Sequence, residues 1–462
     1  MVFSSLTFIG IFLPVVLLCY YICKVRKYRN WVLLIASLFF YAWGEPIWVM
    51  AMVITAFVDY SMGRLMGSDK HSKRSVWPLV FSLVFDLGIL FIFKYSAFVL
   101  GGVNQLLGVH LPMWTAPMPI GISFYTFQSL SYVIDVYRGK AEVQRSYSAY
   151  LMYVAMFPQL VAGPIVRYVD IALQINERKE TLAGFAEGIK RFAIGMGKKV
   201  ILANQAGLLA GTLLDGGRYS MLSAWVGILF FAFQIYFDFS GYSDMAIGLG
   251  KMFGFDYKEN FNYPYISQSI TEFWRRWHIS LGSFFRDYVY IPLGGKYHHQ
   301  LRNVLVVWFL TGFWHGANWN FISWGLYYGL LLLVEKILIR RQIHRIPVVS
   351  YVLTMLLVLY GWALFYFTDF SQLAAFTQAF LGMVPSDPIA SMQVRSVLIG
   401  NLWFLLVCCI ASTPFPAQLY KRMTDKWPAA DHLRPVLMVG VLAAAYILLI
   451  GQSYNPFLYF RF

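Results

Sequence analysis

Charged residues are scarce in this 462-residue chain, at 13% of the total, whereas soluble domains carry about 25%. Hydrophobic residues make up 59% of the sequence. Such a composition excludes an ordinary soluble protein and indicates an integral membrane protein. The apolar runs are continuous and lack period-two alternation, which favours helices over a barrel.

Several functional signatures are also missing. The four cysteines lie in apolar segments, as packing residues rather than a disulfide framework: Cys19, Cys23, Cys408 and Cys409. The histidines lack zinc-ligand spacing, so no metal is expected. We find no G-x-S-x-G elbow, H-E-x-x-H, P-loop or H-x-x-x-x-D motif, and no internal repeat. The net charge of +15 resides in short loops, so nucleic acid is not an expected partner.

Apolar stretches long enough to cross about 30 Å of hydrocarbon recur along the chain. The clearest cores are Val2–Cys23, Asn30–Gly44, Ile47–Met62, Val76–Phe93, Ile120–Tyr137, Met221–Phe239, Leu301–His315, Phe321–Ile339, Val348–Phe367, Ser396–Ile410 and Val436–Ile450. Weaker ones lie between Ser146 and Leu214. The sequence therefore predicts an all-α polytopic membrane protein with eleven to thirteen transmembrane or re-entrant helices, forming one domain over residues 1–462.

Basic residues set the expected orientation. They cluster in alternate short loops, around residues 24–29, 64–74, 340–345 and 421–426, which the positive-inside rule places in the cytoplasm. The first apolar segment has neither a basic start nor a small-residue cleavage site, so we interpret it as a retained span. Both termini, including the aromatic tail 453–462, are then expected outside the membrane.

Polar residues accumulate in the apolar middle of the chain, in three segments: Met118–Gly139, Met156–Tyr168 and Phe233–Phe255. The second also holds two prolines and a glycine, which predicts an unwound or re-entrant stretch. Each polar side chain alone could simply bond across helices. Three such segments in succession indicate an aqueous interior.

The segment Ser269–Gly295 predicts one amphipathic helix near the membrane interface. Ser269 and Glu272 fit a capping box. An aromatic stripe recurs at helical spacing on one face: Phe273, Trp277, Leu281, Phe284 and Tyr288. His278 would lie at the shoulder between the faces. A lipid anchor with snorkelling arginines is the alternative interpretation.

One histidine stands inside an apolar run, in "GFWHGANW" (312–319). His315 would lie near the middle of the bilayer, at the end of a helix whose small residues Gly312 and Gly316 allow close backbone approach or room for a ligand. It is either a satisfied hydrogen-bonding residue or a group that relays or accepts protons.

These two histidine-containing blocks, "EFWRRWHISLGSFFRDYVYIPLGG" and "FLTGFWHGANWNFISWG", resemble the membrane-bound O-acyltransferase superfamily, and its bacterial polysaccharide O-acetyltransferase branch in particular. Segments such as "GISFYTFQSLSYVIDVYRG" and "FDFSGYSDMAIGLGKMFGF" extend the resemblance over nearly the whole chain. It implies helices around a central channel in a bacterial inner membrane. The donor would enter from the cytoplasm and the acceptor from outside.

The resemblance also implies site residues. His315 matches the family's catalytic histidine and would act as general base, a role suited to a neutral imidazole. His278 matches the second histidine, which could orient the acyl carbonyl or stabilise an oxyanion, with the Asn318 and Trp319 N–H groups as competing donors. The expected donor substrate is acetyl-CoA, with no other cofactor; its binding residues would be Trp274, Arg275, Arg276 and Asn318. The arginines could equally meet lipid headgroups.

The chain ends "SYNPFLYFRF", similar to the terminal motif of the small partner protein in teichoic-acid D-alanylation. Tyr459 is therefore a candidate acyl carrier, the alternative being an aromatic anchor at the membrane surface. An extracytoplasmic SGNH-hydrolase-type partner and a cell-envelope polysaccharide acceptor, such as an exopolysaccharide, are implied. The rival functions are D-alanyl transfer, lipid acylation and a non-enzymatic transporter or flippase.

Overall fold

The computed structural model describes residues 1–67, 75–112, 117–161, 163–340, 346–383, 385, 387–451 and 458. Helices account for 78% of the structure, and no strand occurs among these residues, which confirms the all-α prediction. The fold divides into two compact units: Met1–Phe192 with Tyr242–Lys258, and Ala193–Gly241 with Glu259–Phe462. The single domain predicted over residues 1–462 stays a prediction.

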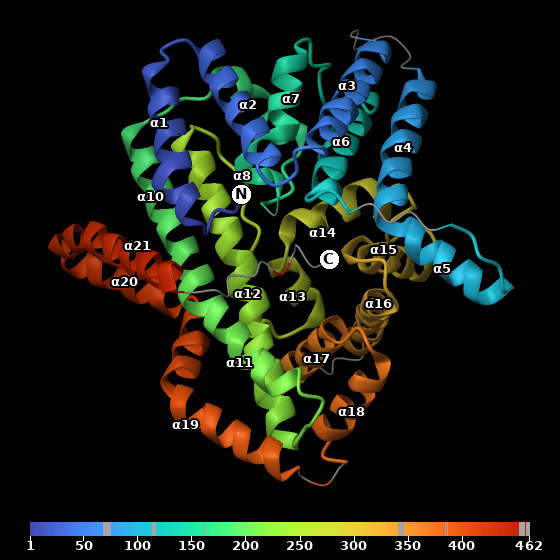
Figure 1. The fold of residues 1–462 in the computed structure, drawn as a ribbon, viewed down its shortest axis with the longest axis vertical. Coiled ribbons are helices and arrows are strands. Elements are labelled where there is room, and N and C mark those ends of the chain that lie inside the picture. The colour runs from blue at the N-terminus through green and yellow to red at the C-terminus, as the bar shows by residue number, and fades with distance from the viewer. Residues whose placement is uncertain are drawn as a thin grey trace. The chain divides into compact units, whose positions relative to one another are not determined.

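The first unit holds the N-terminal helices (Figure 1). They are α1 (Leu13–Ile22), α2 (Arg26–Ala42), α3 (Val49–Leu65), α4 (Val76–Leu90), α5 (Ser96–Leu107), α6 (Ile122–Tyr137), α7 (Tyr147–Ala155), α8 (Phe157–Leu160), α9 (Tyr168–Glu177), most of α10 (Leu182–Met196) and the end of α12 (Met221–Met252). Helices α3, α4 and α6 contact one another. Glu180, which follows α9, binds Arg26 and lies 2.8 Å from Arg29 Nη1. This ion-pair cluster ties the start of α2 to the α9–α10 loop.

The second unit holds the remaining helices (Figure 1). They are the start of α12, α11 (Asn204–Leu214), α13 (Ile270–Arg276), α14 (Ile279–Phe285), α15 (Gln300–His315), α16 (Trp319–Arg340), α17 (Pro347–Tyr366), α18 (Phe370–Phe380), α19 (Pro388–Ala411), α20 (Phe415–Lys426) and α21 (Leu433–Gly451). Local sequence sets their ends. The Asp387 carboxylate accepts the Ile389 and Ala390 N–H groups at 2.9 Å, directly before Pro388 at the first position of α19.

Every one of the eleven apolar cores expected from the sequence lies on a helix. In the described part of the chain, five helical stretches are long and apolar enough to cross a membrane: Val76–Leu107, Met221–Met252, Pro347–Tyr366, Pro388–Ala411 and Pro428–Gly451. The protein is thus a helical membrane protein. The total of eleven to thirteen spans stays a prediction.

Helix α12 differs from the other long apolar helices in its burial. Its most apolar window is 83% buried, whereas the corresponding windows of α19 and the α21 stretch are 22% and 11% buried. A helix covered on all sides by protein forms the core, and one with exposed Leu, Ile and Val residues fits a lipid environment. The polar side chains of α12, which include Asp238 and Asp244, therefore face protein.

The unwound stretch predicted within Met156–Tyr168 is confirmed. Helix α7 ends at Ala155, α8 lasts a single turn, and Met156 between them has non-helical backbone angles. Gln159 of this stretch is fully buried, and its Nε2 donates to the Tyr153 carbonyl at 2.6 Å. Whether they line an aqueous interior stays a prediction.

The prediction of one amphipathic helix over Ser269–Gly295 is wrong. Helix α13 ends at Arg276 and α14 begins at Ile279, because His278 between them is left-handed, with φ of 44°. The facial pattern nevertheless holds: Phe273, Trp277, Leu281 and Phe284 are buried. Phe273 and Trp277 belong to the core of the second unit, so at these positions the stripe packs against protein.

Helices α15 and α16 lie side by side (Figure 1) and approach closely where glycines face each other. A Cβ on Gly312 would lie 2.3 Å from the Phe321 carbonyl oxygen, and one on Gly325 would lie 2.3 Å from that of Trp308. No other residue fits at such distances. The predicted role of Gly312 in close approach is confirmed, and it fixes the helix end that carries His315.

Candidate functional site: two buried histidines

His278 occupies the break between α13 and α14, where its side chain is 2% exposed. A left-handed non-glycine residue costs about 1–3 kcal/mol and persists only where its surroundings enforce it. Here Asn260 does so. Its carbonyl oxygen accepts the Ile279 N–H at 2.9 Å, and its side-chain Oδ1 accepts the Ser280 N–H at 3.1 Å.

The same Asn260 Oδ1 determines the protonation of His278. It lies 3.1 Å from His278 Nδ1 and also accepts the Ser280 hydroxyl at 2.8 Å. An amide oxygen only accepts hydrogen bonds, so Nδ1 must carry a proton. Burial lowers the pKa of His278 to about 3, which keeps the ring neutral at physiological pH. Its Nε2 therefore bears a lone pair.

His315 ends α15 and is 6% exposed. Aromatic rings meet it edge-on: Trp324 of α16 has its centroid 5.0 Å away and Phe365 of α17 5.4 Å away. Trp314 is a neighbour of both imidazoles, with centroids 4.9 Å from His315 and 6.1 Å from His278. The structure thus brings both predicted histidines next to one indole, in a buried and largely aromatic setting.

Helix α13 is held firmly at its start. Ser269 Oγ accepts the Glu272 N–H at 3.0 Å, as the capping box predicted. The Glu272 carboxylate instead accepts the N–H of Gln268, at 2.9 Å. Glu335 of α16 also accepts the Ile270 N–H, at 2.6 Å. These bonds fix the short helix that precedes His278.

The four predicted donor-binding residues differ in their surroundings and their exposure. Trp274 packs within an aromatic cluster, its ring centroid 4.7 Å from Trp308 and 4.8 Å from Tyr328. Arg276 is ion-paired with Glu272 at 2.8 Å. Arg275 is exposed, and Asn318, which directly precedes α16, is half-buried. Arg275 is thus the most exposed of the four, and their role in donor binding stays a prediction.

Helix α12 contributes residues that the sequence did not single out for this site. The Phe239 ring meets His278 edge-on at 4.6 Å. Its neighbour Asp238 accepts the backbone N–H of Leu458 at 2.9 Å and pairs with Lys199 at 2.6 Å. Leu458 is 5% exposed in the core of the second unit. Tyr459 itself lies outside the described residues.

Asn260 is the other residue that sequence reasoning missed. It stands in an irregular loop eighteen residues before His278, and no spacing rule links the two. A polar residue that follows a long apolar helix is usually a solvated loop residue, whereas Asn260 is fully buried.

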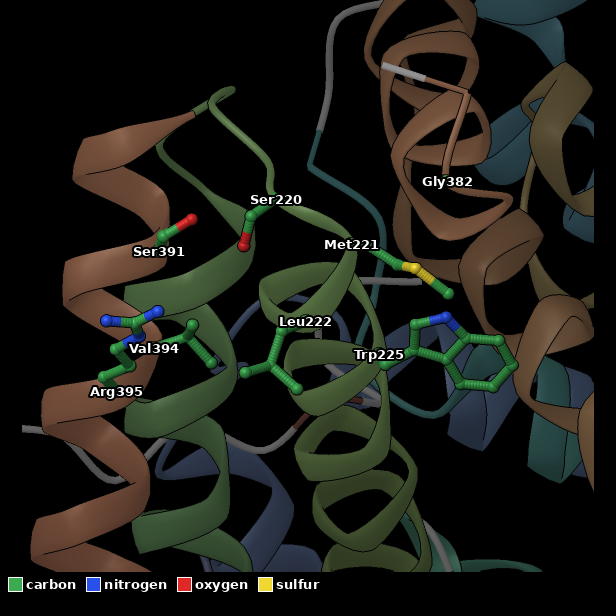
Figure 2. Close-up of a pocket in the computed structure, with 8 residues that line it drawn as sticks. All are labelled: Ser220, Met221, Leu222, Trp225, Gly382, Ser391, Val394 and Arg395. Atoms are coloured by element: carbon green, nitrogen blue, oxygen red, sulfur yellow. The ribbon is translucent and has the colours of Figure 1, made fainter. Parts of the chain in front are cut away.

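A pocket of about 440 Å³ lies elsewhere in the second unit (Figure 2). Its lining residues come from the start of α12, the end of α18 and α19: Ser220, Met221, Leu222, Trp225, Gly382, Ser391, Val394 and Arg395. Figure 2 shows Ser391, Val394 and Arg395 along one helix. None of the residues of the histidine site lines this pocket.

These features define a helical membrane protein with two buried imidazoles that share an aromatic neighbour. Residues 33–376 match the membrane-bound O-acyltransferase family (MBOAT). The chain is 38% identical to the probable alginate O-acetylase AlgI of Azotobacter vinelandii, over 510 residues that cover 100% of both chains. It is 34% identical to the peptidoglycan O-acetyltransferase of Helicobacter pylori, over 73% of this chain and 70% of that one.

A more distant similarity, 29% identity, links it to the teichoic acid D-alanyltransferase of Streptococcus thermophilus, over 48% of this chain and 58% of that one. The chain belongs to the membrane-bound O-acyltransferase family and is an acyltransferase.

Proposed function

We propose that this acyltransferase moves an acetyl group from cytoplasmic acetyl-CoA across the inner membrane, for O-acetylation of a cell-envelope polysaccharide. The full-length similarity to a probable alginate O-acetylase supports acetyl transfer. D-Alanyl transfer has weaker support, because the similarity to a D-alanyltransferase covers about half of the chain at lower identity. A transporter or flippase is disfavoured by membership of an acyltransferase family.

The observation that supports the mechanism is the pair of buried imidazoles, His278 and His315, that both neighbour the Trp314 indole. In the proposed reaction His315 takes the proton of an attacking hydroxyl, whose oxygen forms a bond to the acetyl carbonyl carbon. The carbon–sulfur bond of the thioester then breaks, and His315 returns the proton to the departing CoA thiolate. An aromatic setting keeps His315 able to accept that proton.

The tautomer of His278 favours a role as acceptor. Its Nδ1–H is directed to Asn260, so Nε2 can hold the attacking hydroxyl but has no proton to donate to an oxyanion. This argues against the oxyanion-stabilising role considered for it. The N-terminus of α16, after Asn318, is the better candidate for that task, because the first N–H groups of a helix point out from its end.

Tyr459 is the proposed acceptor of the first transfer. Support comes from its neighbour Leu458, which is buried in the second unit rather than exposed as a lipid anchor would be. In the second step an extracytoplasmic SGNH-hydrolase-type partner would pass the acetyl group from the tyrosine to the sugar. Both termini would then lie outside the membrane.

The test is intact-mass and peptide mass spectrometry of the purified protein after incubation with acetyl-CoA. The wild type should gain one acetyl group on Tyr459, and His315→Ala should not. His298→Ala is the matched control, since His298 is exposed in the loop before α15 and its loss should leave the adduct. Acetylation that survives His315→Ala would refute the assignment of the base. A wild type that transfers acetyl to the polysaccharide without any adduct would refute the carrier role of Tyr459.

A further inference from the structure

The buried ion pair of Asp238 and Lys199 has a polar contact beyond the pair itself. Both side chains are 3% exposed, and their charged atoms lie 2.6 Å apart. The second carboxylate oxygen of Asp238 accepts the backbone N–H of Leu458 at 2.9 Å. Asp238 thus binds a residue that lies 220 positions further along the chain.

A buried ion pair of this kind costs free energy unless further hydrogen bonds compensate for the lost solvation of its charges. Two charges taken from water lose several kcal/mol of solvation each, and only good geometry with further hydrogen bonds restores it. The N–H of Leu458 supplies one such bond, to an ionised acceptor. A main-chain donor makes the contact independent of side-chain identity, while the Leu458 side chain fills the apolar core beside it.

We propose that Asp238, held by Lys199, is the docking site for the protein's own C-terminal segment, and is a positioning residue for the acyl carrier. The ligand it recognises is a peptide N–H followed by an apolar side chain. The positioning role rests on the proposed function of Tyr459, whereas the docking does not.

The geometry of α12 connects this dock to the histidine site. Asp238 binds the chain end, and the next residue, Phe239, meets the ring of His278 edge-on at 4.6 Å. Residue 459 directly follows the anchored Leu458. A single helix segment therefore contacts both the residue before the carrier and one of the two imidazoles.

The experiment is carboxypeptidase Y digestion of the purified full-length protein in detergent, followed by intact mass. Leu458→Pro removes the donated N–H, whereas Leu458→Ala keeps it. We expect the wild type to retain residue 458, and Leu458→Ala, which keeps the N–H but loses core packing, to lose it more slowly than Leu458→Pro. In Leu458→Pro, and in Asp238→Asn, this residue should be lost at least about tenfold faster, as expected for loss of a hydrogen bond to a charged group.

Asp244→Asn is the matched control for Asp238→Asn. Asp244 also lies on α12 and is also ion-paired, 2.7 Å from Arg191, but it belongs to the first unit. Carboxypeptidase Y should digest Asp244→Asn at the same rate as the wild type. Because Asp238→Asn could fail to fold, Leu458→Pro gives an independent result at a position that alters the tail alone.

Acetyl transfer to Tyr459, measured in the same samples, separates the two proposals. Faster digestion in Leu458→Pro and Asp238→Asn without any acetyl adduct in the wild type would uphold the dock and refute the carrier. Equal digestion of Leu458→Pro and Leu458→Ala would overturn the dock, whatever the acetylation. If the dock positions the carrier, Leu458→Pro should reduce the rate of adduct formation at least about tenfold relative to Leu458→Ala.

Discussion

Replacing Asn260 with alanine should disable the enzyme without touching either histidine. Asn260 Oδ1 accepts the Nδ1–H of His278 and the N–H and hydroxyl of Ser280, and all three residues are buried. The hydroxyl can rotate to another acceptor, but the ring and backbone N–H groups cannot. A buried donor left without an acceptor costs roughly 1–3 kcal/mol. Two such donors predict about 2–6 kcal/mol of lost stability, and about 1–3 kcal/mol if a water enters the space and accepts from one of them.

The catalytic effect follows from the tautomer. Without Asn260 the neutral His278 ring can carry its proton on Nε2 or turn, so the lone pair is no longer held in place. A misplacement worth about 2.7 kcal/mol in the transition state lowers kcat about 100-fold. We expect this loss in acetyl-transfer assays of Asn260→Ala, together with a lower thermal unfolding midpoint.

A matched control is Asn303→Ala. Asn303 is equally buried and donates to three carbonyls, those of Leu293, Gly295 and His298, at 3.1, 3.0 and 2.6 Å. Its loss should cost comparable stability but much less kcat. Wild-type stability and kcat in Asn260→Ala, or an equal kcat loss in both variants, would refute the reasoning.

The variant Asn260→Asp tests the assigned tautomer of His278 through the direction of a pH effect on activity. The carboxylate keeps the acceptor but places a negative charge beside Nδ1–H, which raises the pKa of His278 above its present value of about 3. Below the raised pKa, Nε2 is protonated and its lone pair is gone. Activity of Asn260→Asp should therefore fall at lower pH and recover as pH rises. A pH–rate profile identical to the wild type would contradict the assigned tautomer.

Three further outcomes are expected. Gly312→Ala places a methyl group 2.3 Å from the Phe321 carbonyl oxygen, so it should lower stability by about 1–3 kcal/mol and reduce acetyl transfer; an unchanged unfolding midpoint would contradict the close approach. Burial alone would raise the pKa of Glu180, but hydrogen bonds, that from Arg26 foremost, lower it to about 2. The stabilisation is thus present above pH 4.5 and lost as pH falls towards 2, and the gap in unfolding midpoint between wild type and Glu180→Gln should close over that range. Arg275→Gln should raise the KM for acetyl-CoA about tenfold at unchanged stability. An unchanged KM would refute donor binding by Arg275 and favour its contact with lipid headgroups.

The helices and the position of His315 could be predicted because both depend on local pattern. Apolar runs of membrane length have few alternatives to a helix, and a histidine after about ten apolar residues must be buried with them. Gly312 could likewise be assigned to a close contact, since a small residue beside an apolar stripe has little other use in a membrane helix.

The conformation of His278 could not be predicted, because it depends on a long-range bond. The aromatic spacing from Phe273 to Phe284 fits one continuous helix, and it correctly gives the buried face. The break at His278 is made by Asn260, whose backbone and side chain take the N–H groups that a continuous helix would bond internally. Periodicity reports faces but cannot reveal a competing acceptor eighteen residues away.

The left-handed backbone of His278 also restricts how this position can change in evolution. Glycine, asparagine and aspartate tolerate that conformation best, yet none of them offers a neutral imidazole nitrogen. A substitution that relaxes the backbone therefore loses the Nε2 lone pair that holds the hydroxyl, and one that keeps a bulky side chain retains the strain. A descendant enzyme that lost His278 would more readily acquire asparagine or glycine than alanine or leucine, and it would keep the shape of the turn while depending on His315 alone.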